Sequence, residues 1–487
     1  MADRRLLSDR RLRYVLATLV ASGAADGFGP VTVSFAVLRV TGSVGRLGLV
    51  LACQAGVALA LTLAGGMAAD RFPRGRILAI SLAGRAAAAT LLAVTLLTGT
   101  ASFPLLLAAA AGYGCADGFF GPASSALLPQ IVPRHRLARA NALLGGSAST
   151  AAAAAPALAG LTVAALGPGA GFAVQAALLA GAAGTLLAAR LPDRGSESAR
   201  REGPAGRGSP DGRGSRGGRA RPLVALRAGW TEFTRLRWLW LLTAQWLVFS
   251  MLTLAPVTVL GPAIAQRYLG GAAAWGVIST SLALGAVAGQ FGAGRVRLPG
   301  RPALVIAWLL PVMTAEALAL GLGAPLAVVA AAAAVSGLAM GVQGVFFQTA
   351  MQFSVRPDVL ARVVAIDLVG SEGGQPVGYA LAGPLAAAVG AHAFLTASAS
   401  IMAAAGTAFA FVPALRTEVN PSEMLSGKPA DTATRNRADP DDAGAPIGPP
   451  EPPGAFGREK IVEDPAFEAD FGNYSCQNPP QRTSPPQ

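Results

Sequence analysis

The chain has 487 residues, of which 53% are hydrophobic and only 13% are charged, and its mean hydropathy is +0.49. Soluble domains carry about 25% charged residues, so this composition argues against a soluble enzyme. The formal net charge of +13 could indicate a nucleic-acid partner. The basic residues, however, lie mostly between apolar segments, where they act as topology signals. We therefore expect a lipid bilayer as the environment and no nucleic-acid partner.

Metal or cofactor chemistry has little support in the sequence. The three cysteines are far apart, and His135 and His392 are the only histidines, too few for a zinc site. No Gly-Lys-Ser/Thr sequence is present to bind ATP. The sequence thus predicts no metal, no cofactor and no enzyme activity.

Apolar segments of membrane-spanning length recur from Tyr14 to Phe411. A hydrocarbon core about 30 Å thick requires roughly 20 mostly apolar residues per helix. The expected spans are 14–40, 47–69, 77–99, 104–128, 140–166, 171–189, 237–261, 272–294, 302–322, 326–352, 363–389 and 392–413. They predict an all-α polytopic membrane protein with twelve transmembrane helices.

The distribution of arginine predicts the orientation of these helices. Basic residues gather in the N-terminal segment and in every second loop, whereas the other side carries only Arg39, Arg46 and Arg267. By the positive-inside rule both termini are cytoplasmic, and the protein is a multi-pass protein of the cytoplasmic membrane.

An internal repeat divides the spans into two halves. Leu137-Ala138-Arg139 recurs as Leu360-Ala361-Arg362, and Gly65 and Arg71 recur as Gly289 and Arg295, at separations of 223 to 224 residues. Parallel repeats of this kind place a binding site between the halves. The repeat predicts six-helix halves at 14–189 and 237–413. Composition predicts a basic disordered linker at 190–236 and a disordered tail at 414–487, and the positive-inside rule places both, with the N-terminus at 1–13, in the cytoplasm.

A loop motif follows the second span. Gly66, Asp70, Arg71, Arg74, Gly75 and Arg76 form a pattern that resembles the loop motif of the major facilitator superfamily, although Pro73 and Arg74 precede Gly75 and make its second part imperfect. The resemblance implies the twelve-helix fold of that superfamily in two pseudo-symmetric halves. It also implies that Asp70 is part of a gate and holds the start of the eleventh helix near Arg362. A plain polar turn is the alternative.

Further motifs narrow the resemblance. Phe119-Phe120-Gly121-Pro122-Ala123, Leu128-Pro129 and Ala140-Asn141-Ala142-Leu143 look like the branch that includes enterobactin exporters and macrolide-efflux proteins, over residues 11 to 413. Pro156 and Gly160 resemble an antiporter motif with Ala at two of its Gly positions, and Pro376 and Gly383 form a counterpart in the eleventh helix. Generic packing of small residues is the alternative for these helix bends.

Acidic side chains inside the spans are candidates for proton coupling or for the cavity wall. They are Asp26, Asp117, Glu316, Asp367 and Glu372. A charge at the middle of a helix costs about 2.5 to 3.5 kcal/mol on insertion scales, so each needs a purpose. Asp26 and Asp117 are expected to face each other across the cavity and exchange protons with it. Alternatively, Asp26 pairs with Arg85 or bonds to nearby backbone.

These features predict a secondary-active transporter that works by alternating access as a monomer. The favoured function is proton-driven antiport that exports a drug-like, siderophore-like or secondary-metabolite small molecule. The fourth helix lacks the arginine of many proton-driven drug exporters, so protons as the coupling ion are inferred from the acids alone. A solute importer of the same fold and a membrane scaffold or membrane-embedded enzyme are the alternatives.

Overall fold

The computed structural model describes residues 10–71, 73–132, 137–189, 222–296, 299–356 and 359–416. Throughout these residues the regular elements are α-helices with short π-helical and 3₁₀ segments, and none is a strand. The all-α fold expected from the sequence is therefore confirmed.

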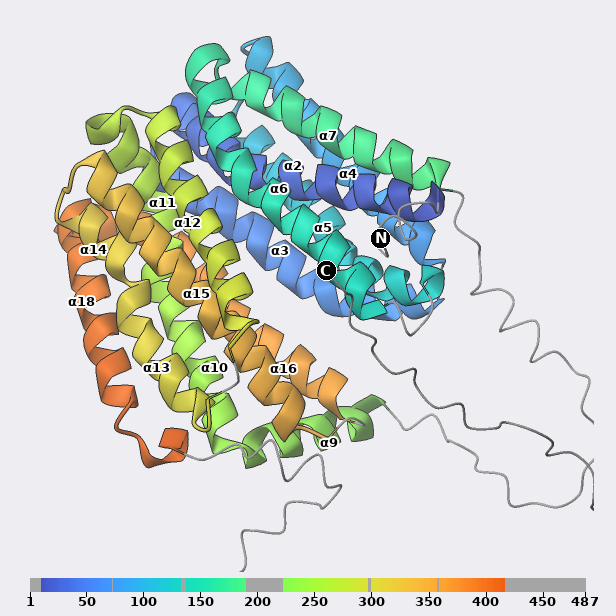
Figure 1. Ribbon diagram of the computed structural model, residues 1–487. Helices are drawn as coiled ribbons and strands as arrows, with labels where there is room; N and C mark the ends of the chain where they lie inside the picture. Colours follow the sequence, from blue (N-terminus) through green and yellow to red (C-terminus); the bar gives the residue numbers. More distant parts are fainter. Residues whose placement is uncertain are drawn as a thin grey trace, which may run out of the picture. The chain divides into compact units, whose positions relative to one another are not determined.

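The first half is a six-helix bundle, coloured blue to green in Figure 1. Its members are α2 (Arg10–Thr41), α3 (Val44–Arg71), α4 (Arg74–Leu97), α5 (Phe103–Ile131), α6 (Leu137–Leu166) and α7 (Pro168–Ala188). Helix α2 packs on α6 and α7, α3 on α5, and α4 on α5 and α7. This packing brings α2, α4 and α5 together around one buried region, in which the candidate site lies.

The second half has the same number of spans, but several are built from more than one segment. One span consists of α10 (Arg237–Phe249), the π-helical η2 (Ser250–Leu254), α11 (Ala255–Ile264) and the π-helical η3 (Ala265–Leu269). The others are α12 (Ala272–Ala293), α13 (Pro302–Met313) with α14 (Ala315–Gly321), α15 (Leu326–Ser354), α16 (Leu360–Glu372) with α17 (Gly374–Val389), and α18 (Ala391–Phe409), before the 3₁₀ turn η4 (Pro413–Arg416). Breaks at Thr314 and Gly373 thus interrupt two of these spans.

The described residues contain eleven helices long and apolar enough to cross a membrane, and α16 with α17 forms a further span broken at Gly373. Together they match the twelve expected segments. The seventh span was placed too short, because it continues from residue 261 to Leu269. Gly261-Pro262 reads as a helix end in the sequence, but Pro inside a membrane helix is tolerated when its neighbours satisfy the freed backbone groups.

The expectation of a disordered linker over 190–236 needs a correction. Helix α9 (Pro222–Arg235) ends that stretch and packs on α16 and α10. Phe233 is 6% exposed and Glu232 is 8% exposed, whereas Trp230 is 56% exposed. This helix therefore has a buried and an exposed face. Residues 1–9, 190–221 and 417–487 lie outside the described part, so the expectations for the N-terminus, the rest of the linker and the tail stay predictions.

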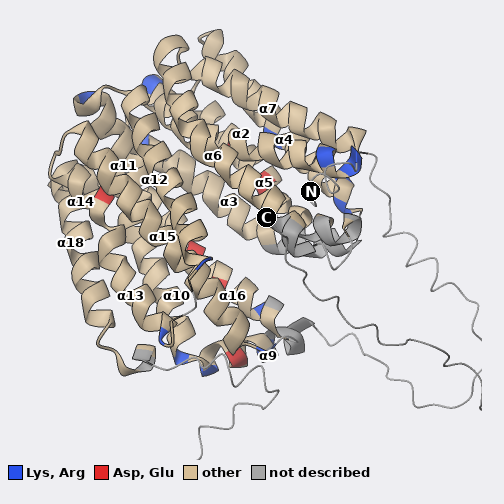
Figure 2. Cartoon of the chain, in the orientation of Figure 1, with Lys and Arg blue, Asp and Glu red and all other residues tan. Residues whose placement is uncertain are grey.

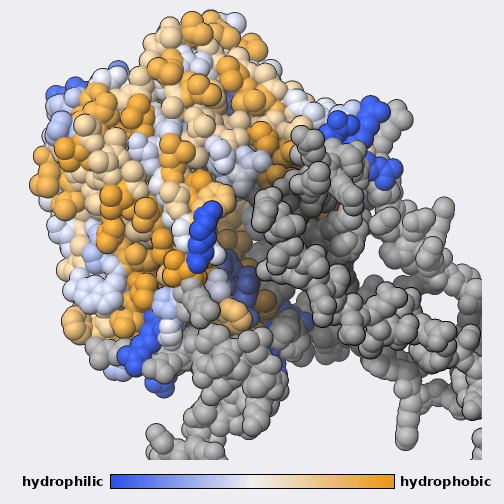
Figure 3. Space-filling model, in the orientation of Figure 1, coloured by the Kyte–Doolittle hydropathy of each residue, from blue (hydrophilic) through white to orange (hydrophobic). Residues whose placement is uncertain are grey.

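Charged residues follow the pattern expected of a membrane protein. Figure 2 shows the described arginines mostly at helix ends, with few acidic residues along the spans. The visible surface over the second half is largely apolar in Figure 3. Large exposed apolar side chains such as Leu161, Val335 and Ile401 lie on the spans, as a hydrocarbon environment requires.

Candidate functional site

Among the described residues of the first half, Arg85 is the most deeply buried charged side chain. It lies eleven residues after the start of α4, and its side chain is 1% exposed. The Tyr113 and Phe120 rings of α5 lie with their centroids 5.0 and 4.9 Å from the guanidinium carbon. Removing an ion from water costs several kcal/mol, so a buried guanidinium needs close counter-charges.

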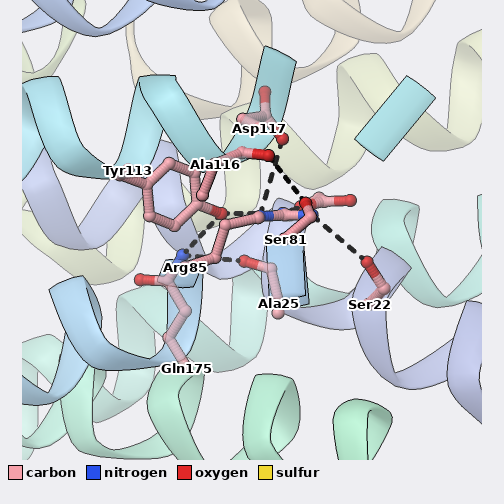
Figure 4. Close-up of polar contacts among 9 residues, drawn as sticks. Ser22, Ala25, Ser81, Arg85, Tyr113, Ala116, Asp117 and Gln175 are labelled. Atoms are coloured by element: carbon pink, nitrogen blue, oxygen red, sulfur yellow. Dashed lines mark hydrogen bonds and ion pairs between the residues drawn. The ribbon is translucent and has the colours of Figure 1, made fainter. Parts of the chain in front are cut away.

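Two carboxylates from different helices supply those counter-charges (Figure 4). Asp26 of α2 accepts a hydrogen bond from Arg85 Nη2. Asp117 Oδ1 of α5 lies 3.5 Å from Arg85 Nε, which suits an ion pair but lacks the alignment of a hydrogen bond. The two Asp side chains remain 44% and 42% exposed. Asp26, Arg85 and Asp117, here called the Arg85 triad, thus combine one buried cation with two accessible anions.

Neutral groups hold the triad in place. Arg85 Nη2 donates to Tyr113 Oη at 2.8 Å, and Nη1 lies 3.5 Å from Ser22 Oγ. Gln175 Nε2 of α7 donates to the Ala25 carbonyl at 3.2 Å and reaches Tyr113 Oη at 3.5 Å. These bonds join α2, α4, α5 and α7 around one guanidinium, which fixes its position.

The triad opens on a cavity of about 370 Å³. Asp26, Asp117, Tyr113 and Gln175 supply polar groups to its wall, and the rest of the wall in the first half is mainly apolar. Its lining residues are Asp26, Gly29, Pro30, Val33, Leu51, Gln54, Ala55, Ala58, Ala89, Leu92, Leu106, Ala109, Ala110, Tyr113, Asp117, Phe172, Gln175, Thr258 and Tyr379. Thr258 and Tyr379 are the members from the second half. A small amphipathic molecule would meet apolar walls with one acidic corner.

One contact between the halves joins α3 to α17. A Cβ placed on Gly48 would meet the Tyr379 carbonyl oxygen, and one placed on Gly383 would meet the backbone of Gly45. Pro376 also faces α3, at Gly56. Gly45 and Gly48 belong to the first turns of α3, far along this helix from Asp70 near its end.

The related contact joins α6 to α12. A Cβ on Gly160 would meet the Ala272 carbonyl oxygen and the backbone of Gly276. The Ala157 N–H, next to Pro156, donates to Thr280 Oγ1 at 2.8 Å. The residues of the antiporter-like bends thus lie where the two halves pack on each other. Their close packing holds the halves together at the end of the spans opposite to Asp70.

The acids of the second half do not line the cavity of the triad. Asp367 is 8% exposed and accepts a hydrogen bond of 2.5 Å from Thr243 Oγ1. Glu372, at the end of α16, lies 3.3 Å from Trp246 Nε1. Glu316 is 6% exposed in the first turn of α14, where its backbone N–H donates to Ser336 Oγ at 3.1 Å. Of the five predicted acids, the structure therefore brings together Asp26 and Asp117.

The expected gate is described only in part. Asp70 and Arg71 are the last two residues of α3, at the inner end of the second span, and their side chains, like the surroundings of Gly66, are outside the described set. Arg74, Gly75 and Arg76 form the first turn of α4. The Cβ of Arg362 faces Gly229 of α9, 2.8 Å from where a Cβ on that glycine would lie. The pairing of Asp70 with the eleventh span near Arg362 stays a prediction.

Comparison with known proteins identifies the family. A family model described as Major Facilitator Superfamily matches residues 14–378. The chain belongs to the Major Facilitator Superfamily. It is an integral membrane transporter and not an enzyme, and no curated protein matches it.

Solved structures agree with this superfamily fold. A bacterial homolog of the human lysosomal transporter Spinster, in an inward-facing and unoccupied conformation, is 17% identical, covers 83% of this chain and 97% of its own, and has a TM-score of 0.57. A POT family transporter in complex with a thioalcohol-conjugated peptide is 11% identical, with 83% and 96% coverage and a TM-score of 0.62. Another POT family structure, with 5-aminolevulinic acid, is 10% identical, with the same coverage and a TM-score of 0.63. At these identities the likeness concerns the fold.

Several residues of this candidate site were not among the sequence candidates. Tyr113, Gln175, Thr258 and Tyr379 reach the cavity, and Arg85 was considered only as a partner of Asp26. Arg85 and Gln175 did carry a signal, because a strongly polar residue within a span is costly unless it has a partner. Nothing in their spacing indicated which partner each would have.

Proposed function

We propose that this Major Facilitator Superfamily protein is a proton-driven antiporter that exports a cationic, amphipathic, drug-like molecule by alternating access. The observation that carries the proposal is the Arg85 triad: one buried cation shared by two carboxylates that remain half-exposed to the cavity. The efflux-like motifs favour drug-like or secondary-metabolite substrates in general. The two carboxylates at the cavity favour the cationic members of that class.

The charge count of the triad supports exchange between a proton and a cation. When both carboxylates are ionised, they exceed Arg85 by one negative charge. A proton on either carboxylate, or the cationic group of a substrate beside it, neutralises that excess. Because the rest of the cavity wall is mainly apolar, the proton and the cationic group of the substrate compete for the position beside the two carboxylates. Such competition is the requirement for antiport, and it disfavours a polyanionic, siderophore-like substrate.

The second half supports the role of the triad by contrast. Its acids Asp367 and Glu372 have neutral partners, Thr243 and Trp246, and do not line the cavity. In our proposal the first half is therefore the coupling half, and Asp117 is held more loosely than Asp26, because it lacks an aligned hydrogen bond to Arg85.

Alternating access follows from the contacts between the halves. Gly48 and Gly383 on one side and Gly160 and Gly276 on the other pack the halves together at one end of the spans. The positive-inside rule assigns that end to the outer face of the cytoplasmic membrane and both termini to the cytoplasm. The described conformation is then closed outside, and rocking the halves so that these contacts separate opens the cavity to the outer side.

Transport assays in everted vesicles test the proposal. A cationic amphipathic dye should accumulate in the vesicles when their lumen is made acidic, so that protons leave as the dye enters, and this dependence should disappear in the Asp26→Asn/Asp117→Asn variant. Glu316→Gln, which removes an acid outside the cavity, is the control and should keep it. Full dependence in the double variant, or accumulation in right-side-out rather than everted vesicles, would contradict proton-driven export.

A further inference from the structure

A second hollow lies on the second half, between α9, α10 and α16. It measures about 800 Å³ and shares no residue with the cavity of the Arg85 triad. Its wall is almost wholly apolar, and it includes Trp230 of α9, Trp240 and Leu247 of α10, and Ile366 and Val369 of α16. Trp240 and Val369 are each 40% exposed, so the groove is open to the surroundings of the bundle.

The groove spans the depth of one membrane leaflet. Leu247 lies ten residues after Arg237, the first residue of α10, which corresponds to about 15 Å along a helix. Gly370 lies equally far from Leu360, the first residue of α16. Since the hydrocarbon core is about 30 Å thick, the groove extends from the membrane surface to about the midplane. A lipid acyl chain covers the same depth.

Helix α9 forms the rim of the groove with the features of an interfacial helix. Phe233 and Glu232 are buried, and the exposed Trp230 and Arg227 belong to the groove lining. Tryptophan and arginine at such a helix are typical of the headgroup level. The one acid of α9, Glu232, is paired with Arg235 at 2.7 Å, so it does not oppose an anion at Arg227.

We propose that this groove binds an anionic phospholipid, with one acyl chain along α10 and α16 and the phosphate beside Arg227. The apolar wall supplies the affinity for the chain, and the rim supplies the preference for a negative headgroup. The lipid joins the linker helix to the seventh and eleventh spans. The proposal does not depend on the direction of transport or on proton coupling.

Fluorescence quenching tests the site on the purified full-length chain in detergent. Phosphatidylglycerol with brominated acyl chains quenches tryptophan on contact, and Trp230 and Trp240 line the groove. We expect saturable quenching at about fivefold lower lipid concentration than with phosphatidylcholine carrying the same brominated chains, the difference that one arginine makes near the membrane surface. Equal quenching by the two lipids would overturn the proposal.

Two pairs of variants locate the lipid. Arg227→Gln should remove the preference for phosphatidylglycerol, whereas Arg237→Gln, at an exposed position outside the groove lining, should keep it. Val369→Phe fills the groove and should abolish saturable quenching, whereas Val377→Phe, at an exposed position of α17, should leave it unchanged. Equal effects within either pair would show that the lipid is bound elsewhere.

Discussion

The two halves treat their buried acids in different ways. In the first half, Asp26 and Asp117 share the guanidinium of Arg85 and stay half-exposed to the cavity. In the second half, Asp367 and Glu372 are bonded to the neutral Thr243 and Trp246. The repeated fold thus places carboxylates within the spans of both halves. Of these four acids, only the two in the first half have a counter-ion, Arg85. The fold therefore does not determine where charge can be exchanged; the local partner does.

Removing Arg85 should have the largest effect on this contrast. Arg85→Met leaves two carboxylates without their cation, and because these are 44% and 42% exposed the cost should lie near the lower end of the about 3 to 5 kcal/mol for breaking a buried pair. We expect a large loss of stability in thermal unfolding of the detergent-solubilised protein, together with loss of transport. Adding Asp26→Asn and Asp117→Asn should recover much of the stability, because no anion is then left unpaired. An unchanged unfolding midpoint in Arg85→Met would contradict the pairing.

The contacts between the halves offer the next test, because each half contributes a glycine that packs against backbone of the other half. Gly160→Leu and Gly383→Leu each introduce a side chain against backbone of the other half. Overpacking of this kind costs about 1 to 3 kcal/mol, so both variants should disfavour the described conformation and slow transport about tenfold or more. Gly184→Leu, which meets open space, is the control. A strong effect from only one of the two substitutions would show that the two contacts do not contribute equally to the described conformation.

Within the triad, the two carboxylates should differ measurably. Asp26→Asn alters an aligned hydrogen bond to a charged partner, so we expect a loss of about 1.5 to 3 kcal/mol of unfolding free energy. Asp117→Asn removes only a loose ion pair of a half-exposed side chain and should cost less than about 1 kcal/mol. Chemical unfolding of both single variants measures the difference. The reverse order would mean that Asp117 is the tighter partner of Arg85.

The smallest effect is expected in the second half. Asp367→Asn keeps an amide oxygen that accepts the Thr243 hydroxyl, and Glu372→Gln keeps one near the Trp246 indole. Both variants should retain at least about half of the transport rate and the full response to a proton gradient, since a neutral hydrogen bond is worth only about 1 kcal/mol. Vesicle transport at two external pH values measures both quantities. Loss of the gradient response in either variant would assign coupling to the second half as well.

Much of the fold was accessible from the sequence because hydropathy is a strong local signal. All twelve spans were found, and the 223- to 224-residue repeat divided them correctly. Helix α9 was missed because its stretch continues a Gly- and Arg-rich linker, and its apolar face has meaning only against α10 and α16. The breaks at Thr314 and Gly373 depend likewise on tertiary packing.

The site was accessible only in part. Asp26 and Asp117 stood out as acids in apolar spans, and pairing of Asp26 with Arg85 was one of two alternatives for that residue. That the same arginine also meets Asp117, while Asp367 meets a threonine, depends on helix rotation, which twelve similar Ala- and Gly-rich spans do not reveal. Weak amphipathicity in such spans leaves the inward face undetermined.

The Arg85 triad also has a consequence for how the chain enters the membrane. Its charges arrive in the order of synthesis as negative on α2, positive on α4 and negative on α5. A charge at a helix centre costs about 2.5 to 3.5 kcal/mol on insertion scales, so Arg85 is best accommodated once Asp26 is already in the bilayer. The arginine that anchors the acidic corner of the cavity therefore also makes the insertion of its helix dependent on the first span.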